Sequence, residues 1–339
     1  MATKIIAASG GDYSDFPTYI TYLKTLGTPS APETCQISGE VDGGFPDFSG
    51  AGFAPTVANP FVIESVSGGK FTGNPLRYVD GARVLLNGST ETFNVGWDNT
   101  TIQNVAIKKT TTGQSGSALG ALFIQATGVT TVQNVIVESA ANGLAVFDDA
   151  TTSTGAVRYN IIALRTVGGN CSSWPAFYVR SGTFSTTYKN ITVGSVGTAV
   201  TSGTGFSAPF VGTTMYNVVV FGHPTDSTSG ESGSHNATDI ASGSSSIPST
   251  NAVYSLNTST AFENVTSPNH DLRAKSGGAL IDAGSSANGT TLDILGNAIS
   301  GGTRDIGAHE YQSGGPSLND NNFDTIARGV ARGVARGVA

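Results

Sequence analysis

The sequence predicts an all-β fold, a single right-handed parallel β-helix with a short N-terminal capping helix and a C-terminal tail. A short phrase built around asparagine occurs six times between residues 101 and 266, and apolar, β-branched residues follow it. No segment between two occurrences has helical periodicity, so the repeat unit consists of short strands and turns. Such self-similarity indicates a solenoid, a propeller or an array. The asparagines are separated by 30, 26, 30, 27 and 47 residues: Asn104, Asn134, Asn160, Asn190, Asn217 and Asn264.

The length of the period selects among these architectures. A propeller blade needs about 40 to 50 residues for its four strands. The regular spacings of 26 to 30 residues are shorter, and they fit one coil of a parallel β-helix. Equivalent residues of successive coils then stack about 4.8 Å apart. The enlarged spacing includes a Ser, Gly and Thr-rich stretch at residues 225–250, which the sequence leaves open as a loop or an extra coil.

The recurrent asparagine has a physical explanation in such a stack. Asparagine tolerates the left-handed backbone region at a bend, and stacked amides can hydrogen-bond to one another. We predict that the six asparagines form one structural ladder, and that those from Asn104 to Asn217 face inward at a corner of the coil. Glycosylation is the alternative, because Asn190, Asn236, Asn264 and Asn288 each begin an Asn-x-Thr sequon. The abundance of Ser and Thr makes chance sequons common in this chain.

The first 33 residues are assigned to a strand and a helical cap. Ser14 or Asp15 can cap the helix, and its apolar face consists of Phe16, Tyr19, Ile20 and Leu23. The first coil of a β-helix exposes an unpaired edge and an apolar interior, so we expect this helix to cover that end. Residues 34–268 are assigned to the β-helix, residues 269–312 to a closing module, and residues 313–339 to a linker and tail.

Two stretches resemble known right-handed parallel β-helix proteins. Residues 10–14, Gly-Gly-Asp-Tyr-Ser followed by a helix, are similar to the opening of many pectate-lyase-like proteins. Residues 269–311, which end in Asp-Ile-Gly-Ala-His-Glu-Tyr, resemble the closing module of bacterial and viral β-helix proteins. The two stretches bracket nearly the whole repeat region. The resemblance implies the fold and not an activity, because that superfamily includes lyases, adhesins, surface proteins and phage structural proteins such as tailspikes.

The sequence indicates no catalytic residue, no metal site and no cofactor. The four histidines are scattered, and none lies at metal-ligand spacing from another ligand. Asp148 and Asp149 would point to opposite faces of a strand, so at most one could face a given groove. Arg273 and Lys275 match the Arg-x-Lys element of polygalacturonases, but the companion phrases of that family are absent. We interpret them as part of the closing module.

The charge and hydrophobicity of the chain argue against two classes of partner, nucleic acids and membranes. Charged residues make up 12% of the chain and the net charge is −7, which argues against a general nucleic-acid-binding body. No apolar run reaches the roughly 20 residues of a transmembrane helix, so we expect no membrane partner. The N-terminus lacks a sustained apolar stretch, and we therefore expect no signal peptide. Cys35 and Cys171 are expected to be buried thiols.

The C-terminal tail is predicted to dock onto a partner. Arginine, glycine and valine each recur there every four residues, which gives basic, small and apolar stripes on a helix. Alone, such a short glycine-containing helix is marginal in water. Several tails together would gain avidity, so we expect a homo-oligomer and favour a trimer. The predicted docking residues are Phe323, Ile326, Arg328, Val330, Arg332, Val334, Arg336 and Val338.

These observations favour a non-enzymatic structural protein of a bacteriophage virion, made in the host cytoplasm. It would decorate a capsid or form part of a head fibre or tail, anchored to other virion proteins by its tail. The first alternative is a tailspike-type protein that binds or depolymerises a host glycan. The second alternative is a bacterial surface adhesin.

Overall fold

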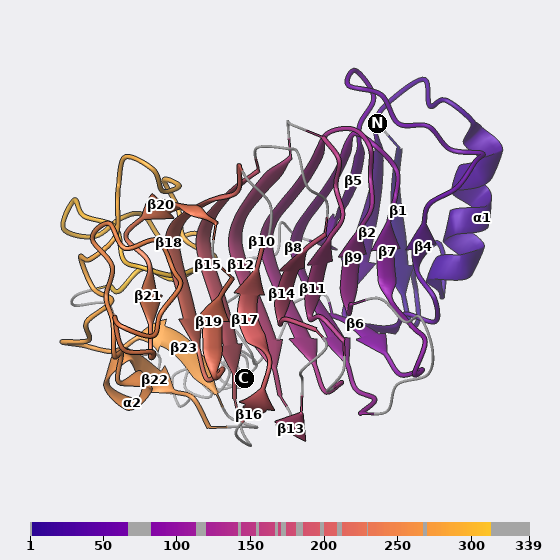
Figure 1. Ribbon diagram of the computed structural model, residues 1–339. Helices are drawn as coiled ribbons and strands as arrows, with labels where there is room; N and C mark the ends of the chain where they lie inside the picture. The colour runs from indigo at the N-terminus through magenta and orange to yellow at the C-terminus, as the bar shows by residue number, and fades with distance from the viewer. Residues whose placement is uncertain are drawn as a thin grey trace, which may run out of the picture.

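The computed structural model describes most of the first 312 residues and shows a single right-handed parallel β-helix (Figure 1). The residue ranges that it describes are 2–66, 83–112, 120–141, 144–153, 156–166, 169–170, 174–180, 186–196, 200–208, 212–228, 230–266 and 270–312. Cys171 and the predicted docking residues of the tail lie outside these ranges, whereas Cys35 is a buried free thiol as expected.

The coils stack through two sheets. The long sheet has the order β1-β2-β5-β8-β10-β12-β15-β18-β20, with every neighbouring pair parallel. Its strands are β1 (Ala2–Ala7), β2 (Glu33–Ser38), β5 (Phe61–Ser65), β8 (Thr100–Lys109), β10 (Thr130–Ser139), β12 (Val157–Arg165), β15 (Thr187–Ser195), β18 (Thr214–Phe221) and β20 (Ser232–Ser234). The same sheet also includes β3 (Glu40–Asp42), which pairs with β6 (Arg83–Leu86), and β6 pairs in turn with β8.

The second sheet consists of shorter parallel strands in the order β19-β17-β14-β11-β9-β7-β4. They are β4 (Asp47–Phe48), β7 (Phe93–Val95), β9 (Leu122–Ile124), β11 (Phe147–Asp149), β14 (Phe177–Val179), β17 (Thr204–Ser207) and β19 (Thr225–Ser227). A further parallel pair joins β13 (Gly169–Asn170) to β16 (Val200–Ser202).

Alternation along the strands places one set of side chains inside the coils. In β8, Ile102, Val105 and Ile107 are buried in the interior, whereas Gln103 faces outward. The interior also holds a stack of aromatic rings on the second sheet. Phe177 lies between Phe147 and Phe206, with ring centroids 4.4 Å and 4.9 Å away. These separations are close to the strand spacing, so identical side chains on successive coils pack face to face.

The N-terminal helix α1 (Phe16–Leu26) covers the first coils, as predicted (Figure 1). Asp15 is its N-cap, and the carboxylate accepts a hydrogen bond from the Thr18 backbone N–H at 2.8 Å. All four residues of the predicted apolar face are buried. The Phe16 ring, for example, packs edge-on against Phe48, with ring centroids 5.8 Å apart. Burial of this face shields the open end of the helical interior from water.

Residues 225–250 add another coil instead of a loop. The strand β19 pairs with β17, while β20 and β21 (Ala237–Thr238) both pair with β18. The register aligns Tyr216 with Ser234 and Val219 with Ala237, so His235 lies opposite Asn217. His235 has a φ of 56°, which is the left-handed conformation that the asparagines adopt in the coils before it.

This extra coil overturns one part of the predicted ladder. Asn264 is the last residue of β22 (Phe262–Asn264), which follows the short helix α2 (Thr258–Ala261) and pairs antiparallel with β23 (Asp271–Ala274). Asn264 is not among the residues with positive φ, and its side chain accepts a hydrogen bond from the Thr266 backbone N–H instead. The sequence pattern recurs at Asn264, but no parallel coil is present there to stack its amide on the amides of the ladder.

Residues 270–312, which we call the C-terminal cover, return over the outer face of the long sheet. A second buried cluster forms there between strand residues and residues of the cover. Ile136, Ile162 and Val219 contribute from the strands, and Ile294 and Ile306 contribute from the cover. Each of these side chains is at most 2% exposed, so the predicted closing module packs alongside the β-helix. Among the described residues, neither helix has the length and hydropathy of a membrane span.

Candidate functional site

The five asparagines from Asn104 to Asn217 form a continuous column. Each has a φ between 52° and 57°, as expected for a bend that favours asparagine. Hydrogen bonds link Asn134 to Asn104 at 3.1 Å, Asn160 to Asn134 at 2.9 Å, Asn190 to Asn160 at 3.1 Å, and Asn217 to Asn190 at 2.9 Å. The ladder therefore joins five successive coils through side chains, in addition to the backbone pairing.

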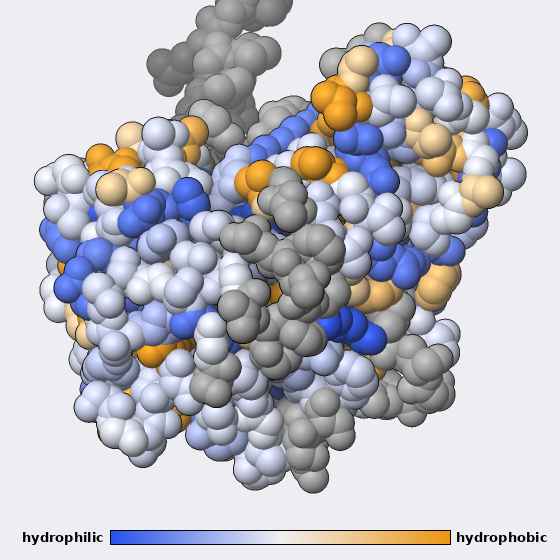
Figure 2. Space-filling model, turned by 45° about the horizontal axis from the view of Figure 1, so that its top comes forward, coloured by the Kyte–Doolittle hydropathy of each residue, from blue (hydrophilic) through white to orange (hydrophobic). Residues whose placement is uncertain are grey.

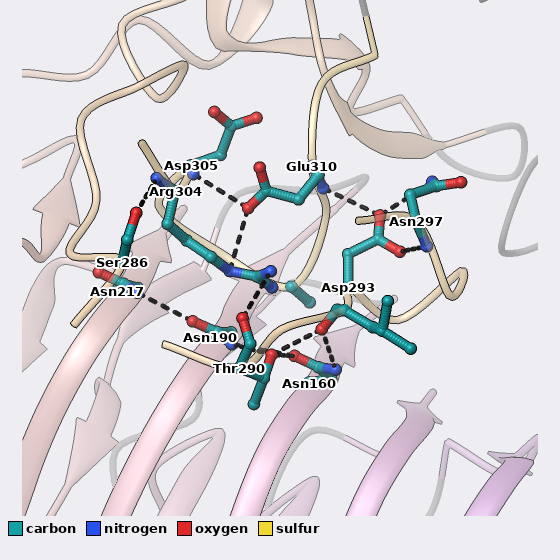
Figure 3. Close-up of polar contacts among 12 residues, drawn as sticks. Asn160, Asn190, Asn217, Ser286, Thr290, Asp293, Asn297, Arg304, Asp305 and Glu310 are labelled. Atoms are coloured by element: carbon teal, nitrogen blue, oxygen red, sulfur yellow. Dashed lines mark hydrogen bonds and ion pairs between the residues drawn. The ribbon is translucent and has the colours of Figure 1, made fainter. Parts of the chain in front are cut away.

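The ladder faces outward, so the predicted inward orientation is wrong. The Asn160 amide donates to the backbone carbonyl of Leu292 at 2.9 Å, and the Asn190 amide lies 2.7 Å from the Thr290 hydroxyl. Asn217 accepts a hydrogen bond from the Ser285 backbone N–H at 2.7 Å. All three partners belong to the C-terminal cover, which lies on the outside of the coils (Figure 3). The residue directly after each asparagine, such as Val105 or Ile161, fills the interior, and the left-handed bend turns the amide away from it.

A network of charged groups in the cover lies above the ladder. Arg304 forms an ion pair with Glu310 at 3.0 Å and donates to the Thr290 carbonyl at 3.3 Å (Figure 3). Burial raises the pKa of Glu310 to about 7, although Arg304 opposes that shift. Asp293 accepts hydrogen bonds from the backbone of Asn297 and Glu310. Because these contacts join the cover to the ladder, we interpret this part of the ladder as a device that fastens the cover.

A different outward row of the long sheet remains accessible. In-register pairing aligns one polar or aromatic residue from each of seven successive strands, and each is partly exposed. We call this set the polar row, and it consists of Gln36, Glu64, Gln103, Gln133, Tyr159, Lys189 and Tyr216. Two strand positions before it runs a second outward row, mostly of β-branched threonine: Thr34, Val62, Thr101, Thr131, Val157, Thr187 and Thr214.

The first members of the polar row are fixed by their neighbours. Glu64 accepts a hydrogen bond from Gln36 at 3.1 Å and another from Gln103 at 2.7 Å. The Gln133 amide donates to Gln103. These contacts orient the amides along the axis of the β-helix and hold them at the strand spacing of about 4.8 Å. Each amide can donate and accept several hydrogen bonds, so part of its capacity remains for a ligand.

The chemistry of the polar row suits an uncharged, hydroxyl-rich ligand. It contains one carboxylate, Glu64, and one ammonium group, Lys189, with amides and phenol rings elsewhere. A hydrolase would need two carboxyl groups roughly 5 to 10 Å apart, which this row does not provide within the described coils. In the view of Figure 2, hydrophilic residues cover most of the surface and hydrophobic residues form small separate groups. The arrangement can hold a linear polymer parallel to the axis of the β-helix.

The two adjacent aspartates point to opposite faces of β11, as predicted. Asp149 faces the interior, where Arg158 forms an ion pair with it at 2.7 Å and Tyr188 donates to it at 3.0 Å. Burial opposes ionisation of Asp149, but the Arg158 guanidinium and the hydrogen bonds from Thr151 together outweigh that effect and lower the pKa of the carboxyl. Asp148 faces outward and pairs with Arg180.

Other candidate residues of the sequence have structural partners. Arg273 pairs with Asp271 at 2.5 Å, and the Lys275 ammonium donates to the Ser259 carbonyl at 3.3 Å. His270 of the cover lies 2.9 Å from Glu138 of β10, where both side chains are buried. Within the described ranges, no three His, Cys, Asp or Glu side chains form a group that could hold a metal ion.

The polar row was not predicted from the sequence, although the positions next to the recurrent asparagines indicate it. Five of its members directly precede the recurrent asparagines, namely Gln103, Gln133, Tyr159, Lys189 and Tyr216. Aligning the repeats on asparagine would have displayed them as one column. The first two members lie in coils without that asparagine, so only the strand register identifies Gln36 and Glu64.

Comparison with known proteins extends no further than the fold. No protein-family model and no curated protein matches the chain. Among solved structures, the chain is similar to one described as "Crystal structure of pectate lyase Pel9A", with a TM-score of 0.46 and 13% sequence identity. The match covers 92% of this chain and 97% of that chain. The stacked parallel coils themselves establish the fold, and the resemblance predicted from the sequence is confirmed at that level.

Proposed function

We propose that this protein is a rigid display protein that binds an extended polysaccharide along the polar row. The observation that carries the proposal is the unbroken register of seven outward polar or aromatic residues across seven strands. A linear glycan presents hydroxyl groups and apolar ring faces at regular intervals. A β-helix presents complementary groups at equally regular intervals, and its stiffness means that little conformational freedom is lost on binding.

The expected affinity comes from many modest contacts. A hydrogen bond between neutral groups contributes a net of about 0.5 to 1.5 kcal/mol, and the tyrosine rings can cover the apolar faces of sugar rings. Tyr159 and Tyr216 lie two strands apart with Lys189 between them, so an amine donor separates the two aromatic surfaces. Loss of one ring should weaken binding by about tenfold, whereas loss of several members should abolish it.

We further propose that the display takes place on a bacteriophage particle, with the polysaccharide being a glycan of the host surface. The support is the sequence of the tail, whose three Arg-Gly-Val repeats carry no acidic residue after Asp324. An acidic partner surface would attract such a tail through arginine–carboxylate pairing. A tailspike-type depolymerase and a bacterial adhesin would use the same polar row, and assays for released oligosaccharide separate the first of these from a binder.

The proposal is tested by native electrophoresis through gels that contain a dissolved polysaccharide. Capsular polysaccharide and lipopolysaccharide O-chains of candidate hosts serve as probes, with homogalacturonan as a plant-polymer comparison. Binding of the polysaccharide retards the chain in the gel. Tyr159→Ala should raise the Kd for the polysaccharide by about tenfold, which corresponds to about 1.4 kcal/mol of binding free energy. Tyr254→Ala is the matched control, since Tyr254 is a half-buried tyrosine outside the polar row. Equal retardation of both variants and the parent by a binding polymer would refute the polar row as the site.

The tail proposal has a separate test. Deletion of residues 324–339 should leave a folded β-helix that still binds the polysaccharide but no longer joins its particle. Normal incorporation of the truncated chain into particles would show that another part of the molecule provides the anchor.

A further inference from the structure

The outer face of the second sheet carries a group of side chains that the polar row does not explain. In-register pairing places Phe123 of β9, Asp148 of β11 and Tyr178 of β14 side by side on successive coils. Arg180 follows β14, and its side chain reaches back to Asp148. Trp174 precedes the same strand and packs against Tyr178. We call these five residues the aromatic–arginine cluster.

Asp148 fixes the Arg180 guanidinium in place. The Nε atom of Arg180 lies 2.7 Å and 2.9 Å from the two carboxylate oxygens, and Nη2 lies 2.5 Å from one of them. The Asp148 side chain is fully buried, whereas the Arg180 side chain is 28% exposed. The carboxylate therefore holds the guanidinium from below in a bidentate pair and leaves its outer edge open to solvent.

Three aromatic rings surround the same guanidinium. Its central carbon lies 4.9 Å from the ring centroid of Trp174, 5.4 Å from that of Phe123 and 5.6 Å from that of Tyr178. Phe123 is buried, but Trp174 and Tyr178 are each partly exposed. Their rings meet edge to face at an interplanar angle of 71°. The cluster thus presents two aromatic surfaces beside hydrogen-bond donors of fixed direction.

The neighbouring Asp149 provides a comparison, because its ion pair with Arg158 has a purely structural role. The Arg158 that pairs with it is completely buried in the interior, where its guanidinium donates hydrogen bonds to Asp149, Thr130 and Thr151. Arg180 differs, because its outer edge and two of its aromatic neighbours reach the surface. Partly exposed tryptophan and arginine side chains held in a fixed geometry are typical of binding hot spots.

Planar amides continue this surface on the coil of Phe123 and on the coil before it. Gln125 is exposed and donates to the Asn94 side chain at 3.0 Å, and Asn94 donates in turn to Asp47 at 2.6 Å. Arg180 and Gln125 occupy equivalent outward strand positions, two coils apart. Hydrogen-bonding groups therefore lie along the coil axis beside the rings.

We propose that the aromatic–arginine cluster is a binding site for a single neutral pyranose unit, distinct from the polar row and independent of it. The apolar face of the sugar would pack on Trp174 or Tyr178, and two adjacent hydroxyl groups would accept hydrogen bonds from Arg180. Asp148 balances the charge of Arg180, so a neutral sugar fits the site better than an acidic one. The site would recognise a chain end or a branch, because its two accessible rings, Trp174 and Tyr178, belong to a single coil.

The test uses the two tryptophans of the full-length chain, whose indole N–H groups give two NMR signals. Trp97 is 4% exposed, and its indole donates to the Gly50 carbonyl at 2.9 Å, so its signal is an internal control for the fold. Hexasaccharides of glucose, mannose, galactose and galacturonic acid are the probes. We expect at least one neutral probe to shift the Trp174 signal saturably with a Kd in the range of about 0.1 to 10 mM, while Trp97 stays unchanged.

Variants separate this site from the polar row. Tyr178→Ala and Arg180→Lys should each weaken the Trp174 titration by about tenfold, whereas Tyr159→Ala should leave it unchanged. An unchanged Trp97 signal verifies that each variant is folded. The proposal is overturned if no neutral probe shifts Trp174, if Arg180→Lys binds like the parent, or if the galacturonic acid probe binds most tightly. A titration that Tyr159→Ala weakens equally would assign the effect to the polar row and also overturn a separate site.

Discussion

Replacement of Asn190 by glycine tests how the asparagine ladder stabilises the fold. Asn190 is fully buried, has a φ of 54°, and lies between Asn160 and Asn217 in the column. Glycine adopts this backbone conformation without strain, so Asn190→Gly removes the amide while it preserves the bend. Alanine removes the same amide but adds about 1 to 2 kcal/mol of strain in the left-handed region. The two variants separate the contribution of the side chain from that of the backbone.

The magnitude follows from the contacts that disappear. The Asn190 amide lies 3.1 Å from Asn160, 2.9 Å from Asn217 and 2.7 Å from Thr290 of the cover. A net of about 1 kcal/mol for each buried hydrogen bond predicts that Asn190→Gly lowers the free energy of unfolding by about 2 to 4 kcal/mol. Asn190→Ala should cost about 1 to 2 kcal/mol more than Asn190→Gly.

Urea denaturation followed by far-UV circular dichroism measures the difference. Asn104→Gly is the matched control, because Asn104 has the same φ of 54° but is half-buried and bonds to Asn134 as its ladder neighbour. We expect this control to shift the free energy of unfolding by less than about 1 kcal/mol. Equal destabilisation by Asn190→Gly and Asn104→Gly would show that contact with the cover adds nothing, and would refute this account of the ladder.

Three further substitutions test other parts of the fold by the same assay. Arg158→Met should cost about 3 to 5 kcal/mol because it leaves the buried Asp149 without its ion-pair partner, and the double variant with Asp149→Asn should recover much of that loss. Glu310 has a pKa raised to about 7 in the folded chain, against 4.5 as its ordinary value, so its stabilising contribution is complete below pH 4.5 and is lost as the pH rises to about 7. Glu310→Gln should remove that part of the pH dependence, and an unchanged profile would contradict the assignment. Phe16→Ala should lower the free energy of unfolding by about 3 to 5 kcal/mol, because it opens the covered end of the β-helix. Phe45→Ala is the control, since Phe45 is exposed. A smaller loss of stability for Phe16→Ala than for Phe45→Ala would refute the covering role of α1.

The local features of the fold were predictable because they depend on short-range physics. The spacing of the asparagines indicated one bend per coil, and the helix with its Asp15 cap was recognisable from turn and capping preferences. The opposite orientation of Asp148 and Asp149 followed from the two-residue period of a strand.

The errors came from contacts that are distant in the sequence. The outward direction of the ladder depends on the cover, and the bond between Asn160 and Leu292 joins residues 132 positions apart. His235 takes the place that the spacing suggested for Asn264, because the last coil is shorter than those before it. A search for repeated asparagines could not show that His235 adopts the same left-handed conformation as the asparagines.

The candidate site was missed for a related reason. The members of the polar row differ in chemistry from coil to coil, so no repeated letter marks them. Their common property is the outward direction at one strand position, which the register of the long sheet establishes.

The structure of the chain with a bound oligosaccharide is the most direct test of the proposed function. The oligosaccharide should be cut from whichever polymer retards the chain in the gel assay. We predict that the sugar chain lies parallel to the β-helix axis and contacts the polar row over the coils between Gln103 and Tyr216. A ligand that crosses the strands at right angles, or that occupies another face and leaves Tyr159 and Lys189 untouched, would contradict the assignment of the polar row as the polysaccharide-binding surface.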